Sequence, residues 1–196
     1  MEKTNKDNTK KSPKRRKKLV IVGNGGCGKT SLLTVFCKGT FPEEYIPTVF
    51  ENDVKDIYYK DETIELALWD TAGQENYARL RPLSYRAADV VLITFALNDR
   101  ESLNAVTHTW LPEVHEYCPK VPILLVGTKS DLREGDQDKC IDSLEGQMVC
   151  QKIDAKALIE TSAKFGINVK ELFHLSTRFA LEYKAEQVDK GCCTVL

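Results

Sequence analysis

The chain has 196 residues and a mass of 22.1 kDa, with 42% hydrophobic and 29% charged residues, which is the composition of one globular domain. No apolar run approaches the about 20 residues that a membrane-spanning helix needs, and the charged N-terminal segment lacks the apolar core of a secretory signal. Seven cysteines, odd in number and without a CxxC pair, argue against a disulfide framework and a structural zinc site and favour a reducing compartment.

The net charge of −1 conceals an asymmetry along the chain. Residues 1–18 contain nine Lys or Arg and two acidic residues, so they carry +7 and the other 178 residues carry −8. Residues 1–17 have no apolar side chain beyond Met1, and Pro13 discourages a helix, so we predict a basic flexible tail. Such an arm is typical of a ligand for nucleic acid, an anionic membrane or a transport receptor, and equally of a solvated tail.

Hydrophobic periodicity predicts strands that alternate with helices from residue 18 onward. Strands are expected at 19–22, 49–59, 63–69, 90–97, 121–126 and 157–160, with a polar turn at 60–62 that makes the second and third an antiparallel hairpin. Helices are expected at 29–38, 100–117, 143–153 and 168–183. This alternation favours right-handed crossovers. The predicted fold is therefore α/β, with a six-stranded, mostly parallel sheet, one antiparallel strand and helices on both faces.

The clearest functional motif lies between the first strand and the first helix. Residues 23–30 read Gly-Asn-Gly-Gly-Cys-Gly-Lys-Thr, which matches GxxxxGK[ST] in the context that this motif needs. Glycines let successive N–H groups point at phosphate oxygens, and the helix N-terminus adds positive potential. Lys29 is expected to reach the β- and γ-phosphates, the Thr30 hydroxyl to bind Mg²⁺, and Cys27 to pack as an inert small residue. The expected phosphate contacts are Asn24, Gly25, Gly26, Cys27, Gly28, Lys29, Thr30 and Ser31.

A second motif follows the strand that ends near Trp69. Asp70 stands at a strand end opposite the phosphate loop, which suits a water-mediated contact to Mg²⁺. Gly73 lets the backbone approach a γ-phosphate, and Gln74 can orient an attacking water.

Two further strand ends carry residues suited to a guanine base. Residues 128–131 read Thr-Lys-Ser-Asp, and the Asp131 carboxylate can accept the N1–H and N2–H of guanine, a pair of donors that adenine lacks. Residues 161–164 read Thr-Ser-Ala-Lys, and the backbone N–H of Ala163 can bind the guanine O6.

The ordered set of motifs resembles the Ras superfamily of small GTPases, and residues 48–52, 69–75 and 79–85 resemble the Rho family in particular. The resemblance covers about residues 18–184 and the last four. It implies a P-loop NTPase G domain over 18–184, between the basic tail at 1–17 and a flexible tail at 185–196. It also implies GTP or GDP as ligand and Mg²⁺ as cofactor.

The resemblance assigns further roles residue by residue. Thr48 would bind Mg²⁺ and sense the γ-phosphate, Phe41 would pack edge-on to the base, and Tyr45 would close over the phosphates. Lys129 would lay its methylenes on the guanine face, and Gln74 would be the catalytic residue. The other nucleotide contacts implied are Gly73, Thr128, Asp131, Ser162, Ala163 and Lys164.

Four features depart from the usual Rho pattern. Thr128 replaces the common Asn, which predicts a weaker tether between the base motif and the phosphate loop. Gly26 stands where Ala is usual, Asp53 replaces a customary Tyr, and residues 132–141 are too few for the extra helix of most Rho proteins. The subfamily is therefore left open.

Two other function classes compete with a GTP-hydrolysing switch. A metabolic P-loop kinase would need an Arg-rich lid, for which Arg79, Arg81 and Arg86 are the candidate cluster, and it leaves Asp131 unexplained. A catalytically inactive GTP-binding module would lack a key residue, yet Lys29, Thr48 and Gln74 are all present.

Residues 39–54 contain no Lys or Arg, so no arginine from this segment can assist hydrolysis, which is expected to be slow alone. The family implies an activating protein, an exchange factor, a dissociation inhibitor and actin-regulating effectors such as formins or kinases. No nucleic-acid partner is expected.

The last four residues, Cys193-Thr194-Val195-Leu196, have the C-a-a-X form, and the terminal Leu predicts a geranylgeranyl group on Cys193. Stable anchoring needs a second signal, for which palmitoylation of Cys192 or the basic N-terminal arm is the candidate. Both tails are expected to leave the domain on the side away from the nucleotide. The expected location is the cytoplasmic face of the plasma membrane, on anionic lipid, with a cytosolic pool.

Overall fold

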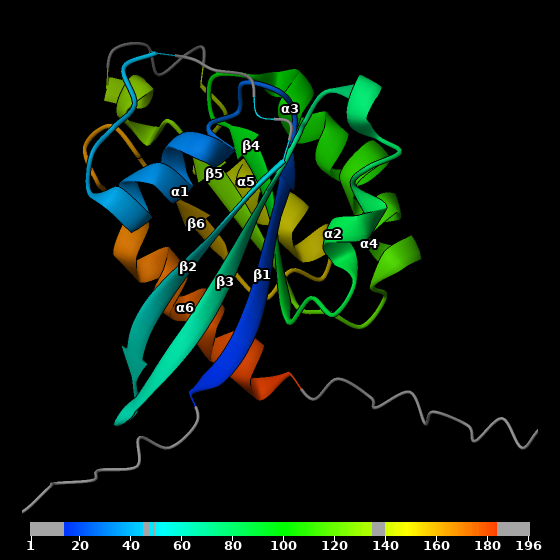
Figure 1. The fold of residues 1–196 in the computed structure, drawn as a ribbon. Helices are drawn as coiled ribbons and strands as arrows, with labels where there is room; N and C mark the ends of the chain where they lie inside the picture. The colour runs from blue at the N-terminus through cyan, green and yellow to red at the C-terminus, as the bar shows by residue number, and fades with distance from the viewer. Residues whose placement is uncertain (1–13, 45–47, 49, 135–139, 184–196) are drawn as a thin grey trace, which may run out of the picture.

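The computed structural model describes residues 14–44, 48, 50–134 and 140–183. A six-stranded sheet lies at its centre in the order β2-β3-β1-β4-β5-β6 (Figure 1). The strands are β1 (Arg15–Gly23), β2 (Phe50–Tyr59), β3 (Glu62–Thr71), β4 (Val90–Ala96), β5 (Ile123–Thr128) and β6 (Leu158–Glu160). β2 and β3 pair antiparallel, and the other neighbours pair parallel. The predicted fold class is confirmed.

Helices cover both faces of the sheet. They are α1 (Lys29–Lys38), α2 (Pro82–Tyr85), α3 (Arg100–Ala105), α4 (Leu111–Tyr117), α5 (Ser143–Lys152) and α6 (Val169–Glu182). Short 3₁₀ turns lie at Glu75–Tyr77 and Ser130–Glu134. The four-residue helix α2 was not predicted because it is too short to show a period. No helix within the described residues has the length and apolarity to cross a bilayer.

The apolar run in β1 is explained by burial on both faces. Leu19 and Ile21 pack in the cluster that includes α1 and α6, whereas Val20 and Val22 pack in the cluster that includes α3 and α4. All four side chains are fully buried, as expected for a central strand of a parallel sheet. The core therefore consists of two layers, and β1 ends at the functional edge of the sheet.

Side-chain caps set where two helices begin. The Asp99 carboxylate accepts hydrogen bonds from the backbone N–H groups of Glu101 and Ser102, at 3.0 and 3.2 Å, and so starts α3. Asp142 starts α5 by accepting a bond from the Leu144 N–H at 3.2 Å. These contacts satisfy N–H groups that the first turn of each helix leaves without a helical partner.

The helix predicted at 100–117 is interrupted by a π turn at Val106–Trp110, between α3 and α4. The Leu111 N–H bonds to the carbonyl of Val106, five residues earlier. Pro112 lies in the first turn of α4 and has no N–H to donate to a carbonyl four residues back. We attribute the wider turn to this proline, because π turns arise where the regular bonding ladder is broken.

The boundary predicted for the N-terminal tail is wrong at residues 15–17, because β1 begins at Arg15. Arg15, Arg16 and Lys17 pair with residues 64–66 of β3, which runs far enough to receive them. Their charges also meet acidic partners. The ion pairs in this region are Lys14–Asp56, Arg15–Glu62, Arg16–Glu65 and Lys17–Asp89.

The two ends of the described domain lie at the same end of the molecule (Figure 1). Figure 1 shows that β1 begins and α6 ends at the same end of the molecule, away from the loop that follows β1. This agrees with the expectation that both tails leave on one side. Residues 135–139, part of the shortened segment, lie outside the described residues, as do Tyr45, Cys192 and Cys193.

Candidate nucleotide site

The phosphate loop wraps around its own lysine. Lys29 is 5% exposed, and its Nζ donates to the carbonyl oxygens of Gly23 and Asn24 at 2.8 and 2.9 Å. Gly26 and Gly28 have φ angles of +73° and +91°, in the left-handed region that L side chains rarely adopt. The loop is therefore curled, with a cation at its base.

The cysteine of this loop is packed beneath it, as predicted. Cys27 is 1% exposed, and its Sγ lies 3.1 Å from the Thr94 Oγ1 of β4. The described structure therefore gives this thiol a packing role.

Three oxygen-bearing side chains meet beside the start of α1. The Thr30 hydroxyl donates to Asp70 Oδ2 at 2.6 Å, and Thr30 Oγ1 lies 2.6 Å from Thr48 Oγ1. The sequence placed these three residues in one metal site, and the structure brings them together from α1, β3 and the segment before β2.

An unsatisfied oxygen tests whether this group fits Mg²⁺. Asp70 is 3% exposed, and its Oδ1 has no hydrogen-bond partner among the described residues. Burial raises the pKa of Asp70, although the hydrogen bond from Thr30 and the charge of Lys29 oppose the shift. A buried carboxylate oxygen next to two hydroxyls is a set of hard donors that suits Mg²⁺, and a cation there would supply the missing partner.

The Gln74 segment lies directly against the phosphate loop. A Cβ on Gly73 would stand 2.3 Å from the Gly23 oxygen and 2.4 Å from the Gly25 nitrogen, so only glycine fits. A Cβ on Gly25 would lie 3.5 Å from Gln74 Cγ. Gln74 itself is exposed, so its side chain lies beside the loop and is accessible from solvent.

The base motifs enclose a cavity of about 300 Å³. Its walls come from the start of α1, from Phe41, from the end of β5 and from the loop after β6. The predicted contacts that line it are Gly28, Ser31, Phe41, Thr128, Lys129, Asp131, Ala163 and Lys164.

The Asp131 carboxylate accepts a hydrogen bond from the hydroxyl of buried Ser162. Its hydroxyl oxygen accepts a bond from the Phe165 N–H at 3.2 Å, so its proton is directed to Asp131 Oδ1, at 2.5 Å. The sequence predicts Ser162 as a nucleotide contact, and in the structure its hydroxyl donates to the carboxylate of Asp131.

Thr128 ties the base motif to the phosphate loop through its hydroxyl, and the strength of this tether, which the sequence predicts to be weaker than that of an Asn, stays a prediction. Its hydroxyl lies within hydrogen-bond distance of the Cys27 carbonyl of the loop and 3.0 Å from the Phe95 carbonyl of β4. One hydroxyl proton is thus shared between two carbonyls, and the shorter side chain reaches the loop directly.

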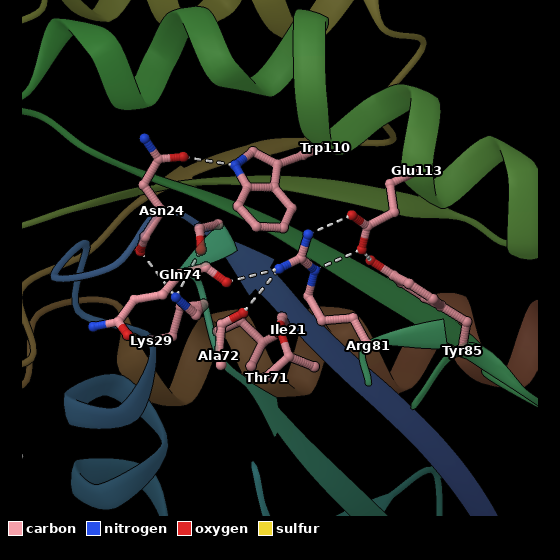
Figure 2. Close-up of polar contacts among 11 residues, drawn as sticks. Ile21, Asn24, Lys29, Thr71, Ala72, Gln74, Arg81, Tyr85, Trp110 and Glu113 are labelled. Carbon is pink, nitrogen blue, oxygen red and sulfur yellow. Dashed lines mark hydrogen bonds and ion pairs between the residues drawn. The ribbon is translucent and has the colours of Figure 1, made fainter. Parts of the chain in front are cut away.

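One arginine of the kinase alternative is buried in an ion pair and is not available as a lid residue. Arg81 is 6% exposed and paired with Glu113, with 2.7 Å between Arg81 Nη2 and Glu113 Oε2 (Figure 2). Neither this pairing nor the contact of Trp110 with the phosphate loop was predicted from the sequence. The available signal was a tryptophan and a glutamate that flank Pro112, inside a predicted helix.

Comparison with known proteins agrees with this geometry. The sequence model of the protein family described as the Ras family matches residues 18–182 of this chain. The chain is 50% identical over 190 residues to the GTP-binding protein RHO1 of Candida albicans, a match that covers 92% of this chain and 96% of that protein.

Proposed function

Because the chain belongs to the Rho family of small GTPases, which bind GTP and hydrolyse it to GDP, we propose that its GTP-bound form recruits effectors that control the actin cytoskeleton. The observation that carries the proposal is the meeting of two loops at the phosphate site. Thr48 reaches it through Thr30, and Gly73 rests on the phosphate loop. Loss of the γ-phosphate would release both segments together, a change of order that a partner can detect.

The residues of the phosphate site have different roles in the proposed hydrolysis. Lys29 offers a positive charge at the base of the loop, and Gln74 orients the attacking water at its mouth. Gly25 leaves room for that water, because any side chain there would point toward Gln74. Mg²⁺, held by Thr30, Thr48 and, through water, Asp70, would neutralise charge on the phosphate oxygens.

An activating protein would complete the site. Residues 39–54 contain no Lys or Arg, so the charge that develops in the transition state lacks an arginine from this segment. An arginine supplied by a partner is worth roughly 10³–10⁵ in rate. An exchange factor, a dissociation inhibitor and effectors such as formins or kinases are the other partners we propose.

The effector proposal can be tested by binding. The chain is loaded with GDP or with a slowly hydrolysed GTP analogue and passed over the GTPase-binding domains of a formin and of a Rho-dependent kinase. We expect retention only of the GTP-analogue form, and loss of retention when Thr48 is replaced by Ala. Equal retention in both nucleotide states would contradict the switch proposal, and no retention by either domain would contradict the actin effectors.

We also propose that a geranylgeranyl group on Cys193 carries the protein to the cytoplasmic face of the plasma membrane. We assign the second signal to basic residues of the N-terminal arm other than those that pair within the domain, with palmitoylation of Cys192 as the alternative. Lys14–Lys17 are engaged by acidic side chains, and Lys18 Nζ lies 3.3 Å from the centre of the Trp69 ring. The arm's contribution is therefore assigned to Lys3, Lys6, Lys10 and Lys11.

Prenylated protein should bind anionic vesicles in a salt-sensitive manner, because each lysine near such a surface adds up to about 1 kcal/mol. Replacing the four arm lysines with Gln should weaken binding while GTP hydrolysis is unchanged. Unchanged binding would favour palmitoylation of Cys192 as the second signal, and a variant with Cys192→Ser tests that alternative directly.

A further inference from the structure

A buried arginine joins the segment that carries Gln74 to the helical layer. The Arg81 Nη1 lies 3.2 Å from the carbonyl oxygen of Gln74 and 3.4 Å from that of Ala72, so the guanidinium spans Gly73 (Figure 2). Both carbonyls belong to the stretch that packs on the phosphate loop. A guanidinium has five N–H donors in a fixed plane, which allows one side chain to bind several acceptors at once.

The other side of this guanidinium is fixed by α4. Arg81 Nε and Nη2 donate to the two oxygens of Glu113 at 2.8 and 2.7 Å. Glu113 Oε1 also accepts a bond at 2.7 Å from the hydroxyl of Tyr85, a residue that is 1% exposed. The guanidinium carbon lies 4.8 Å from the centre of the Trp110 ring. Arg81 therefore has a single arrangement imposed by α4 and by the end of the π turn.

The same turn also holds the phosphate loop. Trp110 is 2% exposed, and its indole Nε1 donates to Asn24 Oδ1 at 2.8 Å. Figure 2 shows Trp110 between Asn24 on one side and Arg81 on the other. The phosphate loop and the segment that carries Gln74 would both contact the γ-phosphate. Both are thus held by the same region, the phosphate loop through Trp110 and the Gln74 segment through Glu113 and Arg81.

From this geometry we infer that Arg81 is a positioning residue for GTP hydrolysis, which holds the backbone of Gln74 against the phosphate loop. The inference rests on the proposed role of Gln74 as the residue that orients the water. Arg81 is separate from the base cavity and from the Thr30, Thr48 and Asp70 group. Its loss should therefore slow hydrolysis while nucleotide release keeps its rate.

The decisive variant removes the guanidinium and its counter-charge together. Arg81→Met with Glu113→Met replaces a buried ion pair by apolar side chains of similar length, which is often neutral for stability, whereas removing one partner leaves a buried charge. The backbone bonds to Gln74 are lost in the double variant. Tyr85→Phe is the matched control, because it removes one bond to Glu113 and leaves every contact of Arg81 in place.

Single-turnover phosphate release and the dissociation rate of labelled GDP are measured on the full chain, with thermal unfolding as a check on folding. We expect the double variant to hydrolyse GTP about tenfold more slowly, since small displacements of a positioned group have effects of up to about 10². GDP dissociation should change less than twofold, and Tyr85→Phe should match the parent. A parent-like hydrolysis rate in the double variant would overturn the inference, as would equal changes in hydrolysis and GDP release.

The variant Gln74→Leu separates this inference from the function on which it rests. If Arg81 acts through Gln74, adding the double variant to Gln74→Leu should lower hydrolysis no further. A further tenfold loss in that background would overturn the positioning role while leaving the role of Gln74 intact. Parent-like hydrolysis by Gln74→Leu alone would instead contradict the proposed mechanism and, with it, the inference.

Discussion

Replacing Asp131 with Asn tests how the base cavity selects guanine. In the proposed site the carboxylate would accept two N–H groups from guanine, and each hydrogen bond to a charged group contributes about 1.5–3 kcal/mol. An amide retains one acceptor and presents N–H donors where the second acceptor was. The direction of the amide is set by the structure, because the Ser162 proton points at the position of Oδ1 and favours the amide oxygen there.

The expected magnitude follows from those contacts. The variant loses one charge-assisted bond and places donor against donor, and each effect costs about 1.5–3 kcal/mol. Their sum of about 3–6 kcal/mol corresponds to a loss of roughly 10²–10⁴ in GDP affinity. Xanthine carries a carbonyl where guanine has its amino group, so XDP should recover much of this loss.

Displacement of a fluorescent GDP analogue by GDP and by XDP measures both effects. Adding Ser162→Ala to Asp131→Asn should leave the GDP affinity low, since guanine presents two N–H donors and either orientation of the amide places its own donors against one of them. Ser162→Ala alone serves as the matched control and keeps the carboxylate. If Asp131→Asn kept the parent's preference for GDP over XDP, the assignment of this cavity to the base would be wrong.

The remaining predictions concern the phosphate side of the site. Gln74→Leu should retain GTP affinity and lose most hydrolysis, with or without a Rho-type activating protein. Gly25→Val should do the same, because its side chain would contact Gln74. Stimulated phosphate release at the parent rate in both variants would refute the mechanism. Burial raises the pKa of Asp70 above the value of about 3.9 for an unfolded Asp, so the folded, Mg²⁺-free protein binds a proton that the unfolded chain releases. The contribution of this group to stability should therefore fall as pH rises between those two pKa values, and Mg²⁺ should reverse the trend because its charge would favour the ionised carboxylate. Urea unfolding of the GDP-bound protein with EDTA or with Mg²⁺, at several pH values, measures this, and a difference in pH dependence between EDTA and Mg²⁺ that survives Asp70→Asn would disprove the assignment to Asp70.

The sequence alone predicted the fold class and the residues gathered at the site. Each motif is a short contiguous run at a strand end, and parallel α/β topology brings those strand ends to one edge of the sheet. The phosphate loop, the Thr30 and Asp70 pair and the base residues therefore needed only the order of strands and helices. The continuous apolar run at 19–22 likewise predicted a strand buried on both faces, because both neighbouring layers are apolar.

Tertiary structure alone decided which distant side chains support those motifs. Thr128 reaches Cys27 across 101 residues, Trp110 reaches Asn24 across 86, and Arg81 pairs with Glu113 across 32. The predicted start of β1 was wrong for the same reason. Its basic residues have the composition of a flexible tail, and only the folded sheet places acidic residues of β2 and β3 next to this end of the strand. Such contacts depend on the register of strands and on the π turn at 106–110, neither of which leaves a local pattern in the chain.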